Sequence, residues 1–546
     1  MKKIALLLSI TLLIQAFMFA DTYQISDVNY NITGKTRQYA LEQQVEIDKD
    51  HIFTNENDLI NYIDDFKQRL ENTRNFEIIT VDFSLEKENA SETNETQTES
   101  KTPEQSESTE PNESAESDSH YLVHLEVSTK DAFHLIGAPY PKYDSNNGFE
   151  FKLKLTDTNF LGTMEKMTSD INFAVEQDSE DDKADVKLGF DIDFDIPFKM
   201  GLFDSKFATA IGFSYTFGDK TPEWDVKAGL ECSLPFKRFS LDFQFYQSFI
   251  RDLDYEDEDI NGTLVHYGDG TYFKENFNFS IPLVLQDVPN WGKIYYKPYI
   301  NIDYYWDFDG ISDKNTDLLG PAFSIGHSLY TSRINWRENF RQGIDASISE
   351  ELCYNIQKEK ISPSLSGELK LYHAFKYVGL CADLFAFACL NDTNTFGDHL
   401  RGVRDDAYYE SDDAEIRMLK ECESSGAIVI SLDMPIRLFR IYWDRIPGIK
   451  KIKFMRYFNM EVQVSPFIDF ALSQNRANDT VFSIKDAFLT GGLELIVYPL
   501  KWRGIQIRGS VGFDLAQKVP GVKKLFNQEW RDSHWYEISI GIGLQY

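Results

Sequence analysis

Apolar and polar residues alternate one by one along most of this chain, from about Phe149 onward. In the longest example, Val186 to Phe198, seven apolar residues occupy every second position, and three of the six intervening residues are aspartates. Successive side chains of a β-strand point to opposite faces, so this pattern gives a strand one apolar and one polar face. The alternation recurs in six further segments: 149–155, 239–245, 277–281, 300–308, 428–436 and 538–546.

Strands of this kind need a large apolar environment for one face. Segments of nine to thirteen residues, separated by Asp, Asn and Gly turns, are typical of barrels that cross a membrane with apolar side chains outside. Aromatic residues that match interfacial girdles lie near the predicted strand ends: Tyr295, Tyr296, Trp306, Trp502 and Trp535. We therefore predict an antiparallel transmembrane β-barrel over residues 133–546, with sixteen to eighteen strands and sixteen preferred. The alternative is a multidomain soluble β protein.

The first twenty residues have the pattern of a secretory leader. Lys2 and Lys3 precede an apolar run from Ile4 to about Phe19, and Ala20 follows as a small residue suited to cleavage. The run is short for a membrane span, so we predict a cleaved signal peptide over residues 1–20 rather than an anchor. No other stretch has eighteen consecutive apolar residues, and a membrane crossing therefore has to be made by strands.

Residues 21–132 are predicted to form a small α+β domain. Its expected elements are a strand at 23–32, a helix at 37–47, a second helix, a strand at 76–83 and a strand at 121–127. The second helix is marked by one apolar stripe with spacings of four, three and four: Leu59, Ile63, Phe66 and Leu70. The expected order is β-α-α-β-β.

An acidic insert, residues 86–119, separates the last two strands of this domain. It has eleven acidic and two basic residues and no aromatic residue, so it cannot bury enough apolar surface to fold. We interpret it as a solvated, disordered loop at a hairpin tip, and a partner-binding acidic tail is the alternative. The whole chain has a net charge of −33, which argues against nucleic acid as a partner.

The sequence contains no catalytic motif. HExxH, a P-loop, a GxSxG elbow and a strand-to-helix GxGxxG are all absent, and the nine histidines are scattered. The five cysteines form no CxxC pair. Paired carboxylates at Asp405–Asp406 and Asp412–Asp413 fit a solvated charge run better than a calcium site. We predict that the protein is not an enzyme and has no cofactor and no metal site.

Four short stretches resemble motifs of a known family. They are LTDTNFLGTM (Leu155–Met164), LRGV (Leu400–Val403), GAIVISLDMP (Gly426–Pro435) and SPFIDF (Ser465–Phe470). With one α+β module ahead of a barrel, the chain resembles the bacterial surface antigen superfamily (BamA/TamA-like), as a member with a single periplasmic POTRA domain. The resemblance covers most of the chain after the leader.

The resemblance implies a site inside the barrel. In the family, the loop with the Arg-Gly motif folds back into the lumen, and its arginine pairs with acidic residues on the next two strands. Carried over, this places Arg401 and Gly402 in the lumen and pairs Arg401 with Asp433 and Asp469. A guanidinium in a confined lumen needs such carboxylate partners.

The last predicted strand resembles the signal by which outer-membrane barrels are recognised for insertion. Its apolar positions alternate with small or polar residues and end on an aromatic residue. The residues assigned to this signal are Ile538, Ile540, Gly541, Ile542, Leu544 and Tyr546. An ordinary last barrel strand is the alternative, and both interpretations can hold together.

The function implied by the resemblance is assembly or insertion of outer-membrane proteins, or protein translocation across the outer membrane. Unfolded β-barrel clients would be captured by β-augmentation at the POTRA edge and at the barrel seam. The other expected partners are outer-membrane lipid and periplasmic chaperones or lipoproteins. Two alternatives remain open: inter-membrane lipid transport, and a passive cation-preferring pore or surface antigen. The pore would be lined by Asp191, Asp193, Asp195, Asp242, Asp303 and Asp307.

Overall fold

The computed structural model describes residues 21–87, 119–144, 148–177, 184–218, 221–260, 263–288, 291–402, 408–410, 416–418, 423–475, 480–501, 506–526 and 535–542. The predicted leader and positions 88–118 of the acidic insert lie outside these ranges. The chain divides into two units, 1–131 and 132–546, which are described separately. Within the described ranges, no helix combines the length and the apolar character that a bilayer span requires.

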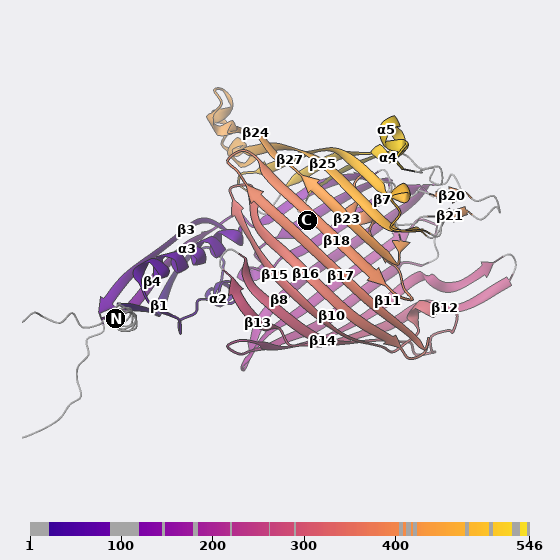
Figure 1. Ribbon diagram of the computed structural model, residues 1–546, viewed down its shortest axis with the longest axis horizontal. Coiled ribbons are helices and arrows are strands. Elements are labelled where there is room, and N and C mark those ends of the chain that lie inside the picture. Colours follow the sequence, from indigo (N-terminus) through magenta and orange to yellow (C-terminus); the bar gives the residue numbers. More distant parts are fainter. Residues whose placement is uncertain are drawn as a thin grey trace, which may run out of the picture. The chain divides into compact units, whose positions relative to one another are not determined.

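The first unit is one mixed sheet with two helices (Figure 1). Its elements are β1 (Thr22–Thr33), α2 (Gln38–Gln44), β2 (Ile52–Phe53), α3 (Glu56–Asn72), β3 (Phe76–Lys87) and β4 (His120–Asp131). The sheet order is β2-β1-β4-β3, and β1 runs parallel to β4. The predicted α+β class is confirmed, but the predicted order lacked β2, whose two residues are too few to show a period. The first helix also ends at Gln44 instead of residue 47.

Helix α3 holds this unit together through the predicted apolar stripe. All four stripe residues are buried, and Leu59 and Ile63 share a cluster with Ile25, Val123 and Leu125 of the sheet. The helix begins cleanly because the side chain of its N-cap residue, Asn55, accepts a hydrogen bond from a backbone N–H in the first turn. Acidic residues in that turn add a favourable interaction with the helix dipole.

The exposed side chain of His124 on this sheet leads us to expect that the stability of the first unit depends on pH. His124 Nδ1 is hydrogen-bonded to Asp27, and its Nε2 lies 3.1 Å from Glu86 Oε2. The bond to Asp27 raises the pKa of His124, and the same bond lowers the pKa of Asp27. The histidine's contribution to stability is therefore lost as the pH rises through its raised pKa, and the aspartate's is lost as the pH falls through its lowered pKa.

We expect the first unit to be most stable at mildly acidic pH, where His124 is protonated and Asp27 is ionised. The measurement is an NMR titration of the His124 ring in protein with labelled histidine. Asp27→Asn should return the pKa of His124 toward its ordinary value. An unchanged titration in that variant would contradict the assignment.

The second unit is a closed antiparallel barrel (Figure 1). Its strands are β5 (Leu135–Asp144), β6 (Gly148–Asp157), β7 (Met167–Gln177), β8 (Ala184–Met200), β9 (Phe203–Thr216), β10 (Glu223–Pro235), β11 (Ser240–Ile260), β12 (Thr263–Ser280), β13 (Leu283–Val288), β14 (Gly292–Trp306), β15 (Ala322–Arg337), β16 (Phe340–Asn355), β17 (Lys360–Ala374), β18 (Gly379–Cys389), β23 (Gly426–Asp433), β24 (Ile436–Ile441), β25 (Met460–Asn475), β26 (Thr480–Val481), β27 (Phe488–Pro499), β28 (Ile507–Asp514) and β29 (Tyr536–Ile542).

The barrel has more strand positions than the preferred number. Within the described ranges it has 21 strands, and these include three pairs, β12/β13, β23/β24 and β26/β27, in which both members pair with a common neighbour and occupy one position. Three fewer than 21 leaves 18 positions, the upper end of the predicted range, so the preference for sixteen was wrong. Two of the breaks occur at prolines, Pro282 and Pro435, which lack the N–H that a continuous ladder needs.

The two faces of the wall differ as the alternation predicts. Large apolar side chains of β8, including Leu188 and Phe190, are exposed on the outer surface, and so are Ile428 and Ile430 of β23. In a membrane, lipid covers such a surface, and closure leaves no unpaired strand edge in the hydrocarbon. The structure thus confirms the predicted outer-membrane type of barrel and excludes the soluble alternative.

The barrel closes where its last strand meets its first. In the described ranges, β29 and β5 share two register pairs, Ser539 with Asp144 and Ile540 with Tyr143. By contrast, β28 and β29 share seven. The seam is therefore sparsely paired over the residues that the structure describes, which end at Ile542.

Candidate functional site

The chain between β18 and β23 carries the predicted site. It contains β19 (Asn394–Thr395), which pairs with β22 (Glu423–Ser424), and a 3₁₀ turn, η3 (Gly397–His399). On either side of that turn, Phe396 and Leu400 are buried in a cluster with inward-facing residues of the wall. The wall residues of this cluster are Phe387, Ala427, Val429, Ala471 and Phe488. Phe396 and Leu400, one on each side of η3, therefore anchor the loop on the lumen face.

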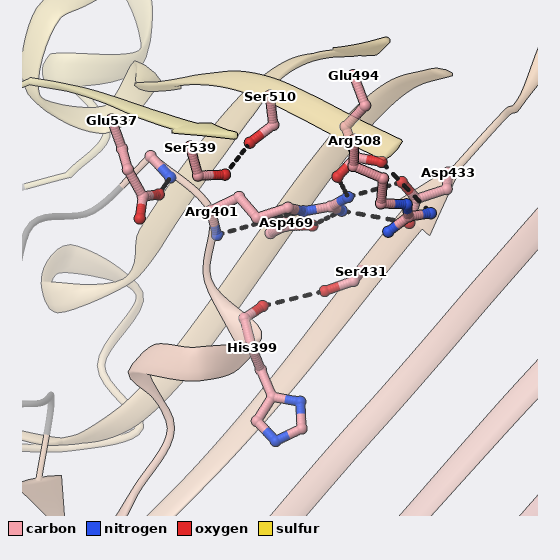
Figure 2. A network of polar contacts seen from close by, with 11 residues as sticks. His399, Arg401, Ser431, Asp433, Asp469, Glu494, Arg508, Ser510, Glu537 and Ser539 are labelled. Carbon is pink, nitrogen blue, oxygen red and sulfur yellow. Dashed lines mark hydrogen bonds and ion pairs between the residues drawn. The ribbon is translucent and has the colours of Figure 1, made fainter. Parts of the chain in front are cut away.

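Arg401 follows these anchors and reaches two carboxylates (Figure 2). Its Nη1 lies 2.7 Å from Asp433 Oδ1 on β23, and its Nη2 lies 2.6 Å from Asp469 Oδ1 on β25. Arg401 Nε and its backbone N–H each donate to Asp469 Oδ2 at 3.0 Å. The structure thus brings together the three side chains that the resemblance pairs, and the guanidinium binds both carboxylates with two donors, the geometry in which arginine is strongest.

A third carboxylate completes the cluster. Glu494 Oε1 on β27 lies 3.3 Å from Arg401 Nη1, and its other oxygen lies 3.6 Å from Arg508 Nη2 on β28. The Arg401 guanidinium carbon also lies 3.8 Å from the centre of the Phe467 ring, in a cation–π contact. The sequence reasoning missed Glu494. The available signal was a single glutamate at an inward position of the otherwise apolar segment 493–500.

The site is almost closed to solvent. The side chains of Asp469 and Glu494 are 0% and 1% exposed, and that of Arg401 is 12% exposed. Buried charges of this kind are tolerated only when they are paired, so the loop arginine and the three wall carboxylates depend on one another.

Gly402 brings the loop backbone against the end of the sheet. Its φ is +90°, and a Cβ on it would lie 2.7 Å from the backbone nitrogen of Phe513 and 2.8 Å from the carbonyl carbon of Gly512. A Cβ on Gly512 would in turn lie 2.7 Å from the Gly402 Cα. Two facing glycines therefore let the loop cross β28 at backbone contact distance.

The loop also contacts the last strand. The backbone N–H of Gly402 donates to Glu537 on β29, as Figure 2 shows. Next to it, the hydroxyls of Ser510 and Ser539 are hydrogen-bonded at 2.7 Å between β28 and β29. Arg401 and Gly402 together therefore contact five strands, β23, β25, β27, β28 and β29. The last of these, β29, forms the seam.

The predicted C-terminal signal strand is partly described. Ile538, Ile540, Gly541 and Ile542 lie in β29, and Ile540 is exposed on the face opposite Ser539. Leu544 and Tyr546 lie outside the described residues.

One group of side chains has donors suited to a metal. Glu368 of β17, Asp383 of β18 and His399 of η3 each place one ligand atom within 4.8 Å of the others. Lys370 Nζ lies 2.7 Å from Glu368 Oε1, and the His399 ring stacks on Phe385 with its centre at 4.0 Å. Because the Lys370 ammonium already neutralises Glu368 on the same strand, we interpret the group as an ion pair within β17 next to the loop histidine.

The aspartates assigned to the alternative pore differ in their surroundings. Asp195 is paired with Lys206 at 3.0 Å, Asp303 accepts from Asn276 and Asp242 accepts from Ser233. Asp191 and Asp193 are exposed on β8. Asp307 follows the end of β14 and is not part of the wall, because the strand ends at Trp306.

Three solved structures illustrate what this chain is similar to, whereas no protein-family model and no curated protein matches it. CdiB from Acinetobacter baumannii aligns over 96% of this chain and 74% of its own, with 12% identity and a TM-score of 0.43. BamA from Haemophilus ducreyi lacking POTRA domains 1–3 aligns over 95% and 84%, with 13% identity and a TM-score of 0.37. CdiB from Escherichia coli aligns over 95% and 90%, with 9% identity and a TM-score of 0.40. At these values the likeness is distant, so the description of the fold rests on the strand order of this chain.

Proposed function

We propose that this chain is a single-POTRA member of the bacterial surface antigen superfamily that assembles or translocates client proteins at the outer membrane. The observation that carries the proposal is the lumen loop. Arg401 ties it to three wall strands, and Gly402 ties it to Glu537 on the strand that closes the barrel. A loop that holds one side of a seam with two register pairs in the described ranges can couple events in the lumen to opening of the wall.

The first unit offers a place to capture a client in the periplasm. Strand β3 lies at the edge of its sheet and pairs only with β4 in the described ranges. Its 12 residues leave one row of backbone donors and acceptors available, and Ile78 and Leu85 are exposed on it. An extended segment of an unfolded client can add to such an edge by backbone hydrogen bonds. This is β-augmentation without a demand for a particular client sequence.

A disulfide across the seam tests the proposal directly. In a background without the five native cysteines, Asp144→Cys and Ser539→Cys join a register pair of β5 and β29. We expect the oxidised pair to abolish support of outer-membrane barrel assembly or surface export in depleted cells, and reduction to restore it. The readout is the amount of outer-membrane barrel proteins and of exported surface protein.

The matched control is Val511→Cys with Ile538→Cys, a register pair of the well-paired junction between β28 and β29. This bond locks a contact that does not have to open, so activity should remain. If the protein is depleted and both the amount of outer-membrane barrel proteins and surface export stay unchanged, the proposal is ruled out.

The pore alternative is favoured by one observation, the exposed carboxylates of β8. Planar-bilayer recordings separate the two functions, because a passive pore gives a large, steady, cation-selective conductance. A flickering conductance or none is expected of an assembly factor.

A further inference from the structure

One segment of this strongly acidic chain is basic. Residues 435–459 contain seven Lys or Arg and one Asp, although the chain as a whole has a net charge of −33. The segment spans β24 and the connection to β25, so it lies at the rim where β5 begins, because neighbouring strands alternate in direction. We call this the proximal rim. It also carries the turns 338–339 and 375–378.

A groove of about 630 Å³ opens at this rim between β24 and the two turns. Four cationic side chains line it, Arg337, Lys376, Arg437 and Arg440, against a single lining carboxylate, Glu338. Its apolar lining includes Leu438 and Phe439 of β24, both of which are exposed. The groove therefore combines cationic side chains with exposed apolar side chains at the rim.

Two of these arginines are held in place. Glu461, which is fully buried, accepts from Arg440 Nε and lies 2.9 Å from Arg437 Nε. Glu338 contacts both guanidinium groups. Four cations thus face two carboxylates, leaving a surplus of two positive charges, and the exposed Arg337 and Lys376 are the cations outside this ion-paired cluster.

The connection after β24 forms an ordered arm beside the groove. It consists of three 3₁₀ turns, η5 (Trp443–Arg445), η6 (Ile449–Lys451) and η7 (Lys453–Phe458), and stands out from the rim in orange in Figure 1. Asn459 closes its base: Oδ1 accepts from the Trp443 backbone N–H, and Nδ2 donates to Asp444. The single acidic residue of the segment is therefore turned to the base of the arm.

Apolar and basic side chains are exposed close to one another on the arm. Ile452 and Phe454 are 54% and 62% exposed, beside the basic residues Lys450, Lys451 and Arg456. Apolar tips next to lysine and arginine are typical of segments that lie in the headgroup region of an anionic membrane.

We propose that the groove and arm bind the headgroup of an anionic phospholipid in the leaflet at the proximal rim. The phosphate meets the cations of the groove, and an acyl chain follows Leu438 and Phe439 down the outer wall. The inference rests on the proposed function only for the choice of leaflet, since that function puts the rim where β5 begins on the periplasmic side, at the phospholipid leaflet. The lipid would anchor β24, and through it the strands that hold Arg401, in a fixed position in the bilayer.

The first test measures, by native mass spectrometry, how much lipid the full chain retains from nanodiscs of phosphatidylglycerol or of phosphatidylcholine. The second test titrates phosphatidylglycerol into the detergent-solubilised protein and gives its binding affinity. Each surface cation contributes about a 5-fold change in affinity for an anionic lipid, so Arg337→Ala with Lys376→Ala should weaken binding about 30-fold. The matched control is Lys237→Ala with Arg238→Ala, two exposed cations in the turn between β10 and β11 at the same rim. It should change binding by less than 2-fold.

Equal retention of the two lipids by the wild-type protein would overturn the proposal, as would equal losses in the two double variants. Inorganic phosphate that binds the groove as tightly as the lipid does would assign it to a free anion instead. Added salt should release phosphatidylglycerol from the unmodified protein, a check that needs no variant. None of these readouts involves a client, so they can fail while the seam experiment succeeds, and the reverse also holds.

Discussion

Replacing Arg401 by methionine is expected to lower the free energy of unfolding of the barrel by about 3–5 kcal/mol, because breaking a buried ion pair leaves its partners uncompensated. Asp469 and Glu494 are buried and would lose their shared cation, and the loop would lose its polar attachment to β23 and β25. The measurement is urea unfolding in detergent micelles, together with the temperature at which the folded band disappears on gels without boiling.

Two further variants make this result specific. Arg238→Met removes an exposed arginine from the turn between β10 and β11 and should change stability by no more than about 0.5 kcal/mol. Adding Asp433→Asn and Asp469→Asn to Arg401→Met should recover part of the loss, because the uncompensated charges are removed. An Arg401 variant as stable as the Arg238 control would contradict the dependence of loop and wall on one another.

The second large effect is expected at the backbone contact beside this arginine. Gly402→Ala should destabilise the barrel by about 3 kcal/mol, from a positive φ and a Cβ forced against β28. Gly448, in the arm at the proximal rim, has nearly the same φ of +93°, but a Cβ there meets nothing within 4 Å. Gly448→Ala should therefore cost only the conformational part, about 1–2 kcal/mol.

The difference between these two alanine variants isolates the close approach of loop and strand. Gly512→Ala places the same obstacle on the opposite side of the contact and should resemble Gly402→Ala. Both should also weaken the Gly402 hydrogen bond to Glu537, which hydrogen exchange of the Gly402 amide would report. Equal losses at Gly402 and Gly448 would mean that the contact is not tight in solution.

Much of the fold follows from local patterns in the sequence. The alternation in β8 required a sheet with one apolar and one polar face, and the stripe of α3 required a helix packed on a sheet. The strand number was less well predicted, since sixteen was preferred and the described residues form 18 positions. Pairing partners, which sequence periodicity does not contain, decide whether two segments count as one strand. The two-residue strand β2 was not predicted for a related reason, since it is defined only by its pairing with β1.

The residues of the candidate site also divide into those that the sequence predicted and those that only the structure identified. The family resemblance selected Arg401, Asp433 and Asp469, and these side chains are in contact in the structure. Glu494, Phe467 and Glu537 were not selected, because each is an ordinary strand residue until the register places it opposite the loop. Gly402 and Gly512 are 110 positions apart, and only the path of the loop across β28 shows why both lack a side chain.

The sequence by itself determined that the regular strands have one apolar and one polar face, since strand periodicity is a local property of the backbone. It also determined where acidic charge accumulates, as in the insert 86–119. The tertiary structure alone decided which of the many inward carboxylates surround Arg401 and which strands meet at the seam. Those choices depend on register and closure, which are set by pairing between segments far apart in the chain and leave no periodic trace in either one.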